Sequence, residues 1–177
     1  MREIIKLALI LLLITSIAAF VLGITNDVTK VIIQERAIEE MMESIQALLP
    51  ETEEVEMVED ESVLTRDNIN LVYRATAGGN VVGYAIQTTP QGYDGSVEVL
   101  VGIAAEGQVT GVVIGAHTET PGLGTKIQEP NFLEQFEGQG TEGEVQVDGI
   151  SGATASSNAV VRGVNSAATV FEEELKN

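Results

Sequence analysis

The chain has 177 residues, with 9 Lys and Arg against 27 Asp and Glu, and its formal net charge is −18. Because a protein that binds the phosphate backbone needs a basic face, this charge excludes nucleic acid as a partner. The absence of cysteine excludes disulfide scaffolds, iron–sulfur clusters, thiolate metal sites and cysteine nucleophiles, and a single histidine excludes a histidine-rich metal site. We therefore expect no metal centre, although carboxylates could still hold a hard cation.

The first predicted element is a membrane anchor. Leu7–Ile24 is a run of 18 residues without a charge, and a helix of that length spans about 27 Å, close to the hydrocarbon thickness of a bilayer. A cleaved signal peptide that begins at Arg2 and Lys6 is the alternative, but the run exceeds the ~7–15 apolar residues usual for a signal. Two basic residues precede the run and two follow it closely, so the positive-inside rule leaves the orientation open.

A stalk helix is predicted next. Apolar residues recur at spacings of three and four from Val28 to Leu49, which fits one face of a helix. Asn26 or Asp27 can cap its start, and Pro50 ends it. Residues 51–61 then carry seven acidic side chains in eleven positions, a pattern that indicates an exposed linker.

After the linker the sequence changes to short apolar runs of strand-forming residues. Turn residues at 77–79 and 106–107 separate these strands in pairs, so two hairpins are expected. The predicted strands are Ile69–Thr76, Asn80–Thr88, Ser96–Ala105 and Gln108–Ala116, with a further short strand at Glu144–Val147. The predicted helices are a short one at Asn131–Phe136 and a C-terminal one whose apolar face is Val160, Val161, Val164, Ala167, Ala168, Phe171 and Leu175.

The fold class that follows is α+β: an N-terminal transmembrane helix and a stalk helix, then an antiparallel-sheet domain with a C-terminal helix. The expected organisation is a transmembrane anchor at residues 1–25, the stalk helix and acidic linker at 26–62, and the folded domain at 63–177. The acidic domain should stay off anionic lipid headgroups and remain soluble beside the membrane.

Two loops carry residues suited to binding chemistry. Asp148–Ser157 joins the last predicted strand to a helix and holds four hydroxyls among small residues, which is the outline of an anion site at a helix N-terminus. The alternative is that one Ser or Thr caps the helix while Gly152 makes the turn. His117–Lys126 contains two glycines, which allow a flat ligand close to the backbone, and the alternative, which these residues alone favour, is a plain solvent loop.

The motifs in these loops resemble those of a known family. Asp148–Thr154 reads Asp-x-x-Ser-Gly-Ala-Thr, which resembles the acceptor motif of covalently flavinylated proteins, and Glu119–Gly124 reads Glu-Thr-Pro-Gly-Leu-Gly, which resembles the second signature of the same domain. The chain is similar to the FMN-binding G subunit of the Rnf ion-translocating electron-transport complex and to its relative, the C subunit of the sodium-translocating NADH:quinone reductase. The resemblance covers nearly the whole chain, including the anchor and the Gly92–Gly95 turn.

This resemblance implies FMN joined through its phosphate to the hydroxyl of Thr154 by a flavinyltransferase that uses FAD and magnesium. Asp148, the acidic first position of the motif, would serve recognition by the transferase. No residue is expected to act in acid–base catalysis. The other residues expected to bind the cofactor are Ser151, Gly152, Ala153, Glu119, Thr120, Gly122, Leu123, Gly124 and Lys126.

The resemblance also implies a place in the cell and a set of partners. The domain would lie on the extracytoplasmic side of the cell membrane, held by a single span in the bilayer, and would contact the other membrane subunits of an Rnf-type complex. That complex couples ferredoxin and NAD electron transfer to sodium or proton translocation. The chain itself has no dinucleotide fingerprint after a strand, so it is not expected to bind NAD.

Three alternatives stay open at the level of the sequence. The chain could be the FMN subunit of a sodium-translocating NADH:quinone reductase, or a membrane-tethered binding module without a cofactor, in which the Ser/Gly/Thr junction only caps a helix. A hydrolase with Ser151 or Ser156 as nucleophile would need His117 as its base. Nothing in the sequence places that histidine beside either serine, and a structural role in the loop fits it better.

Overall fold

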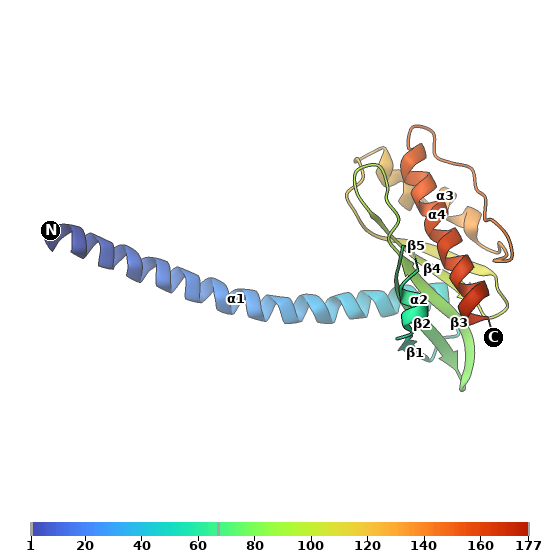
Figure 1. The fold of residues 1–177 in the computed structure, drawn as a ribbon, viewed down its shortest axis with the longest axis horizontal. Helices are drawn as coiled ribbons and strands as arrows, with labels where there is room; N and C mark the ends of the chain where they lie inside the picture. The colour runs from blue at the N-terminus through green and yellow to red at the C-terminus, as the bar shows by residue number, and fades with distance from the viewer. Residues whose placement is uncertain (1, 67, 177) are drawn as a thin grey trace. The chain divides into compact units, whose positions relative to one another are not determined.

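The computed structural model describes residues 2–66 and 68–176. The chain divides into two compact units, Met1–Met42 and Glu43–Asn177, and each is described by itself (Figure 1). The described residues of the first unit all belong to helix α1, whose last residues lie in the second unit. The second contains a five-stranded sheet with the remaining helices.

Helix α1 runs without a break from Arg2 to Leu48. The predicted cap at Asn26 or Asp27 is therefore wrong, because both residues lie inside the helix. Asn and Asp in a helix interior cost well under about 1 kcal/mol each relative to Ala, and no proline interrupts this stretch, so helix propagation continues through it. Pro50 follows the end of the helix as predicted.

The segment Ile4–Gly23 of α1 is long and apolar enough to cross a membrane. Its 20 residues give about 30 Å of helix, and its large apolar side chains, such as Leu11 and Phe20, are exposed. The hydroxyl of Thr15 donates to the carbonyl oxygen of Leu11 at 3.0 Å. A polar side chain satisfied within its own helix suits a hydrocarbon environment.

The sheet is an antiparallel meander with the strand order β1-β2-β3-β4-β5. The two predicted hairpins are confirmed, and Gly78 and Gly79 both have positive φ in the turn of the first one. The strands are β1 Glu54–Met57, β2 Ile69–Ala77, β3 Asn80–Thr88, β4 Val97–Ala104 and β5 Val109–His117.

Strand β1 corrects the prediction that residues 51–61 form only a linker. Its backbone pairs with β2, and flanking bonds extend the pairing: Glu53 N–H donates to Thr76 O at 2.9 Å, and Val58 N–H donates to Val72 O at 2.8 Å. Three of its four side chains are exposed. An edge strand needs no apolar face when its side chains remain in water, and charges on it prevent pairing with other chains. The acidic composition therefore hid the strand.

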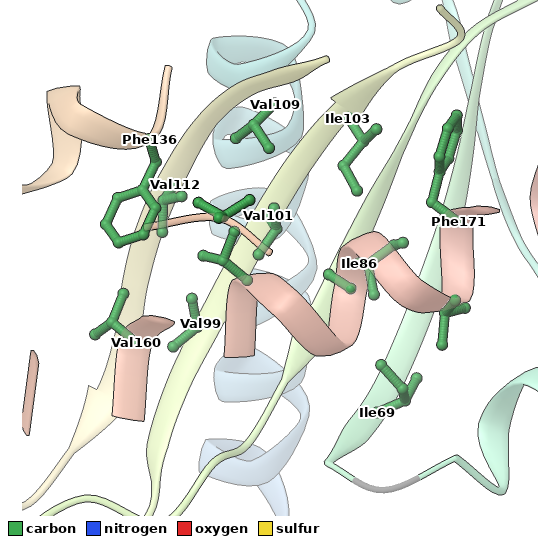
Figure 2. Packing of buried hydrophobic residues seen from close by; sticks show 14 of the residues in the cluster. Ile69, Ile86, Val99, Val101, Ile103, Val109, Val112, Phe136, Val160 and Phe171 are labelled. Carbon is green, nitrogen blue, oxygen red and sulfur yellow. The ribbon is translucent and has the colours of Figure 1, made fainter. Parts of the chain in front are cut away.

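Helix α4 (Thr154–Val170), extended by the π-helical turn η3 (Phe171–Leu175), packs on one face of β3 and β4. Figure 2 shows Val160 of this helix beside Val99 of the sheet, and Phe171 on the side of Ile86. The predicted apolar face is confirmed, since all of its residues are buried except the partly buried Val161. The short helix predicted after Pro130 forms as α3 (Pro130–Leu133) and the 3₁₀ turn η2 (Glu134–Phe136), preceded by the 3₁₀ turn η1 (Gly124–Gln128), while α2 (Glu61–Leu64) follows β1.

The predicted strand at Glu144–Val147 is wrong, because this segment is irregular. A side chain of α4 takes the place of a neighbouring strand: Val145 N–H donates to Asn165 Oδ1 at 2.8 Å, and Asn165 Nδ2 donates to Val145 O at 3.1 Å. The backbone groups that a ladder would pair are thus satisfied by one asparagine. Val145 itself is buried in the core.

The end of α1 packs on the other face of the sheet. Leu48 and Leu49 are buried there against strand glycines. A Cβ added to Gly102 would lie 2.8 Å from Leu48 Cβ, and one added to Gly83 would lie 2.8 Å from Leu49 Cδ2. The strands therefore lack side chains where the leucines enter, and this packing makes the end of the helix part of the second unit.

Replacing Phe171 by Ala should destabilise the second unit by about 3–5 kcal/mol, because the ring is fully buried and lies edge-on to Tyr84 with centroids 5.9 Å apart. The measurement is thermal unfolding of the detergent-solubilised full chain. The half-exposed Val81 on β3, changed to Ala, is the control and should change stability by less than about 0.5 kcal/mol. Equal losses in both variants would contradict the assigned core.

Stability should also fall in acid through Glu172. The hydrogen bond from the Thr141 hydroxyl, followed by that from Lys176, lowers the pKa of this carboxyl below its ordinary value of 4.5. A carboxyl whose folded pKa is depressed adds stability above its unfolded pKa and loses it as pH falls through the folded value. Denaturation midpoints measured from pH 7 to pH 3 should therefore drop less in Glu172→Gln than in the wild type or in the exposed control Glu106→Gln. An identical acid dependence in all three would contradict this assignment.

Candidate functional site

Three segments that are distant in the sequence surround a cleft of about 440 Å³. They are the turn between β3 and β4, the loop after β5, and the first turn of α4, which gather at the end of the domain where α4 begins (Figure 1). A volume of this size lies in the range of small-molecule sites. The residues that line it are Tyr93, Glu119, Thr120, Leu123, Gly124, Gly152, Ala153, Thr154, Ala155 and Ser156.

The structure brings the two sequence motifs together. Of the residues predicted to bind a cofactor, seven line the cleft: Glu119, Thr120, Leu123, Gly124, Gly152, Ala153 and Thr154. Ser151, Gly122 and Lys126, and the predicted recognition residue Asp148, do not line it. Tyr93, Ala155 and Ser156 also line it, although the sequence analysis did not select them as cofactor-binding residues. Ser156 was considered only as a nucleophile, and Tyr93 was covered only as part of the Gly92–Gly95 turn.

No side chain caps the N-terminus of α4. The N-cap position is held by Ala153, which has no hydrogen-bonding side chain, and Gly152 makes the turn before it with φ +80°. The alternative in which a Ser or Thr caps this helix is therefore wrong. An uncapped helix start leaves its first N–H groups directed at whatever lies ahead of it, and the helix dipole favours a negative group there.

The hydroxyls around this helix start have different roles. Ser157 is buried; its Oγ accepts from Ile150 N–H and donates to Ala153 O, both at 2.9 Å. Ser156 is buried and donates to Glu119 Oε2 at 2.5 Å. Thr154, by contrast, is exposed on the cleft wall, and its hydroxyl forms none of the hydrogen bonds found among the described residues. Ser151 is exposed outside the cleft.

Glu119 connects all three segments. Its side chain is only 4 % exposed. Oε1 accepts from the backbone N–H groups of Tyr93 at 2.8 Å and Asp94 at 3.5 Å, and Oε2 accepts from Ser156 Oγ. A carboxylate buried without a cation needs such donors, because an unsatisfied buried charge is costly. The carboxylate is thus occupied by protein groups.

Two glycines make room for this carboxylate. A Cβ added to Gly92 would lie 2.1 Å from Glu119 Oε1, and one added to Gly124 would lie 2.6 Å from Glu119 Oε2. Both separations are far below any contact between a real Cβ and an oxygen, so a side chain at either position would displace the glutamate. Gly124 of the second signature and Gly92 of the Gly92–Gly95 turn therefore serve close packing within the protein.

The rest of the 117–126 loop forms the rim of the cleft. Thr120 O accepts from Leu123 N–H and Thr125 N–H, and this tight turn presents the Leu123 side chain, 47 % exposed, close to the place where a Cβ on Gly152 would lie. Tyr93, which also lines the cleft, is 74 % exposed. An aliphatic and an aromatic side chain thus border the opening.

The structure also places the residues that were considered for catalysis or for recognition by a transferase. His117 Nδ1 accepts from Glu119 N–H at 3.3 Å, and Ser156 is bonded to Glu119. Neither observation supports a Ser–His pair, so the hydrolase alternative has no geometry behind it. The backbone of Asp148 is held by Gln135, with Asp148 N–H donating to Oε1 at 2.8 Å, and its side chain is exposed. Among the described residues that were searched, no group of acidic or histidine side chains could hold a metal ion.

Comparison with known proteins identifies a domain family and several relatives that match nearly the whole chain. Residues 92–169 match the FMN-binding domain. The chain is 35 % identical over 197 aligned positions to the G subunit of the Na(+)-translocating ferredoxin:NAD(+) oxidoreductase complex of Acetobacterium woodii, and the match covers 99 % of this chain and 95 % of that protein. It is 34 % identical to the G subunit of the ion-translocating oxidoreductase complex of Methanosarcina acetivorans, over 94 % of this chain and 93 % of the relative.

Solved structures support the fold. The crystal structure of the C subunit of Na(+)-translocating NADH-quinone reductase from Parabacteroides distasonis superposes with a TM-score of 0.54, 21 % identity, and coverage of 71 % of this chain and 79 % of that one. NqrC from Shewanella oneidensis gives a TM-score of 0.51 at 22 % identity, covering 70 % of this chain and 67 % of that one. At these identities the likeness concerns the architecture alone.

The turn that precedes α4 can be tested with two glycines. Gly152→Ala should cost about 1 kcal/mol or more, because φ +80° is strained for a residue with a Cβ even though the nearest atom, Leu123 Cδ1, is 3.7 Å away. Gly149→Ala is the matched control, since its φ is not positive and its nearest neighbour is 3.8 Å away. Thermal unfolding should separate the two variants, and equal stability would contradict the described turn.

Proposed function

The chain belongs to the family of G subunits of Rnf-type ion-translocating oxidoreductase complexes, and from this premise we propose that it carries FMN on Thr154 and transfers electrons within such a complex. The complex would couple electron transfer between ferredoxin and NAD to the translocation of sodium ions or protons. The observation that carries the proposal is the state of Thr154 itself: of the hydroxyls in the first turn of α4, it is the one that is exposed on the cleft wall and not used in an internal hydrogen bond.

The residues present fit the cofactor. The uncapped amides of α4 and the positive end of its dipole suit the phosphate of FMN, and the small residues Gly152 and Ala153 let that phosphate approach the backbone. Leu123 and Tyr93 supply aliphatic and aromatic surface for a flat ring, as is usual in ligand sites. The 440 Å³ of the cleft, open at the exposed Tyr93, suits a flavin that is held but stays accessible to a redox partner.

Attachment would be made by a flavinyltransferase, with the Thr154 oxygen displacing AMP from FAD and losing its proton as the phosphoester forms. Thr154 would be modified in preference to its neighbours, because the hydroxyls of Ser156 and Ser157 are buried and already hydrogen-bonded. Asp148 is exposed, close in sequence to the acceptor and outside the cleft. Such a position suits recognition by the transferase without interfering with the flavin.

The redox chemistry would be supplied by the flavin when bound, and the chain's own residues would position and retain it. The helix start would hold the phosphate, the 117–126 loop and Tyr93 would border the ring, and the covalent bond would prevent loss of the cofactor. No described side chain in the cleft forms a hydrogen-bonded acid–base pair with His117. The proposal assigns no catalytic acid or base to the chain.

The helix segment Ile4–Gly23 would anchor the protein in the cell membrane as a single span. We place the folded domain on the extracytoplasmic side, where the resemblance puts it and where free FMN would be scarce. The partners are then the lipid bilayer and the other membrane subunits of the complex. The FMN subunit of a sodium-translocating NADH:quinone reductase is the second candidate, favoured by the shared fold, but the relatives that match nearly the full chain at 34–35 % identity are G subunits of ion-translocating complexes.

Replacing Thr154 by Val should abolish the covalent flavin and leave the fold intact, because valine has the same shape without the nucleophilic oxygen. The measurement is in-gel flavin fluorescence of the denatured full chain, expressed in a host with the transferase and extracted from its membranes. Thr169→Val is the matched control, since it makes the same change at an exposed threonine of the same helix, outside the motif and the cleft, and should leave the band unchanged.

The two results that would overturn the assignment are distinct. A fluorescent band from Thr154→Val would show that another residue accepts the flavin. A dark wild-type band with unmodified mass would show that the motif is unused and would favour the cofactor-free binding module. Membranes carrying Thr154→Val should also lose ferredoxin-dependent NAD⁺ reduction. Unchanged activity in these membranes would show that a flavin on Thr154 takes no part in this electron transfer.

A further inference from the structure

We propose that Glu119 is a positioning residue that clamps the Gly92–Gly95 turn and the first turn of α4 to the 117–126 loop, and so sets the shape of the flavin cleft. The inference rests on the proposed function for the identity of the ligand. The clamp itself rests on the hydrogen bonds of one buried carboxylate. It assigns to the glutamate of the second signature a role within the protein, in place of the direct binding of the cofactor expected from the sequence.

The first argument is the reach of the side chain. The carboxylate spans between Tyr93 N–H, 26 residues away in the sequence, and Ser156 Oγ, 37 residues away. Each oxygen serves a different segment: Oε1 accepts from the turn, and Oε2 accepts from the helix. In the described part of the chain, no other side chain is bonded to both of these segments.

The second argument is the space that surrounds the carboxylate. Gly92 and Gly124 approach it so closely that neither position can carry a Cβ while the glutamate stays in place. Because one glycine lies in the clamped turn and the other in the loop of Glu119 itself, the backbone on both sides is fitted to this side chain. Such fitting is expected where a site has to be rigid before its ligand arrives.

The third argument connects the clamp to the cofactor. Tyr93, whose backbone is bonded to Glu119, presents its exposed ring at the cleft, and Ser156 lies two residues after the proposed attachment point Thr154. Movement of either segment would change the wall beside the ring or the position of the phosphate. The clamp therefore fixes both ends of the proposed flavin site through the backbone.

Conservative variants of Glu119 distinguish the effect of side-chain length from the effect of its charge. In Glu119→Gln the side-chain carbonyl can still accept from Tyr93 N–H, while the amide group can donate to Ser156 Oγ, so the clamp is kept without its charge. Glu119→Asp keeps the charge but is one methylene shorter and cannot span the two segments. Glu119→Ala removes the clamp altogether. We therefore expect Gln to preserve the wild-type behaviour and Asp to resemble Ala.

The test uses the full chain in detergent and has two readouts. Hydrogen exchange at the Tyr93 amide should become about tenfold faster in Glu119→Ala and Glu119→Asp, since losing one hydrogen bond to a charged acceptor has at least that effect, and stay near the wild-type rate in Glu119→Gln. The visible circular dichroism of the bound flavin should change in the first two variants and be retained in the third. Phe171→Ala, destabilised at the far end of α4, is the control for general loosening and should leave the flavin signal unchanged.

Ser156→Ala provides a second route if Glu119→Ala fails to fold. It removes the bond to the helix alone, so the flavin signal should change while the Tyr93 amide stays protected. An unchanged Tyr93 exchange rate in flavin-loaded Glu119→Ala or Glu119→Asp would overturn the clamp, and so would an unchanged flavin signal in both. If the wild-type chain carries no flavin, the proposed function fails and the cleft role fails with it, a result that the exchange measurement distinguishes from failure of the clamp alone.

Discussion

The hydrogen bonds of one buried glutamate determine how the candidate site is assembled. Glu119 belongs to the loop after β5, yet its two oxygens are bonded to the turn before β4 and to the first turn of α4. Burying a carboxylate away from cations is favourable only when donors surround it, so Glu119 couples the positions of the three segments. The cleft with Thr154 on its wall is a consequence of that requirement.

Helix α4 links the core to the site. Its apolar face packs on β3 and β4, which fixes the direction of its axis, and the same rigid helix places its uncapped N-terminus at the cleft (Figure 2). A structural helix would gain stability from a capping Ser or Thr, and here that position holds Ala153. In the proposed function the missing cap leaves these amides free for the FMN phosphate, and the small residues of the motif let that phosphate approach the backbone.

The sequence predicted the elements that depend on local patterns. The hairpin strands and the apolar stripe of α4 follow from periodicity, and they are confirmed to within one residue or so. Where the prediction was wrong for β1 and for the segment around Val145, contacts between residues distant in the sequence determine the structure. Strand β1 gains its place by pairing at an edge despite its acidic side chains, and the expected strand around Val145 is replaced by bonds to Asn165. Asn26 and Asp27 do not start a helix, because helix already precedes them.

The same distinction holds for the site. Motif residues such as Glu119 and Thr154 could be selected from the sequence because they belong to a recognisable pattern, whereas Tyr93 joins the site through a backbone hydrogen bond to a residue far along the chain.

Mass mapping of the tryptic peptide from Ile127 to Arg162, prepared from the native membrane, tests the central claim most directly. The account predicts one FMN phosphate on Thr154. An unmodified peptide, or flavin on Ser151, would contradict it.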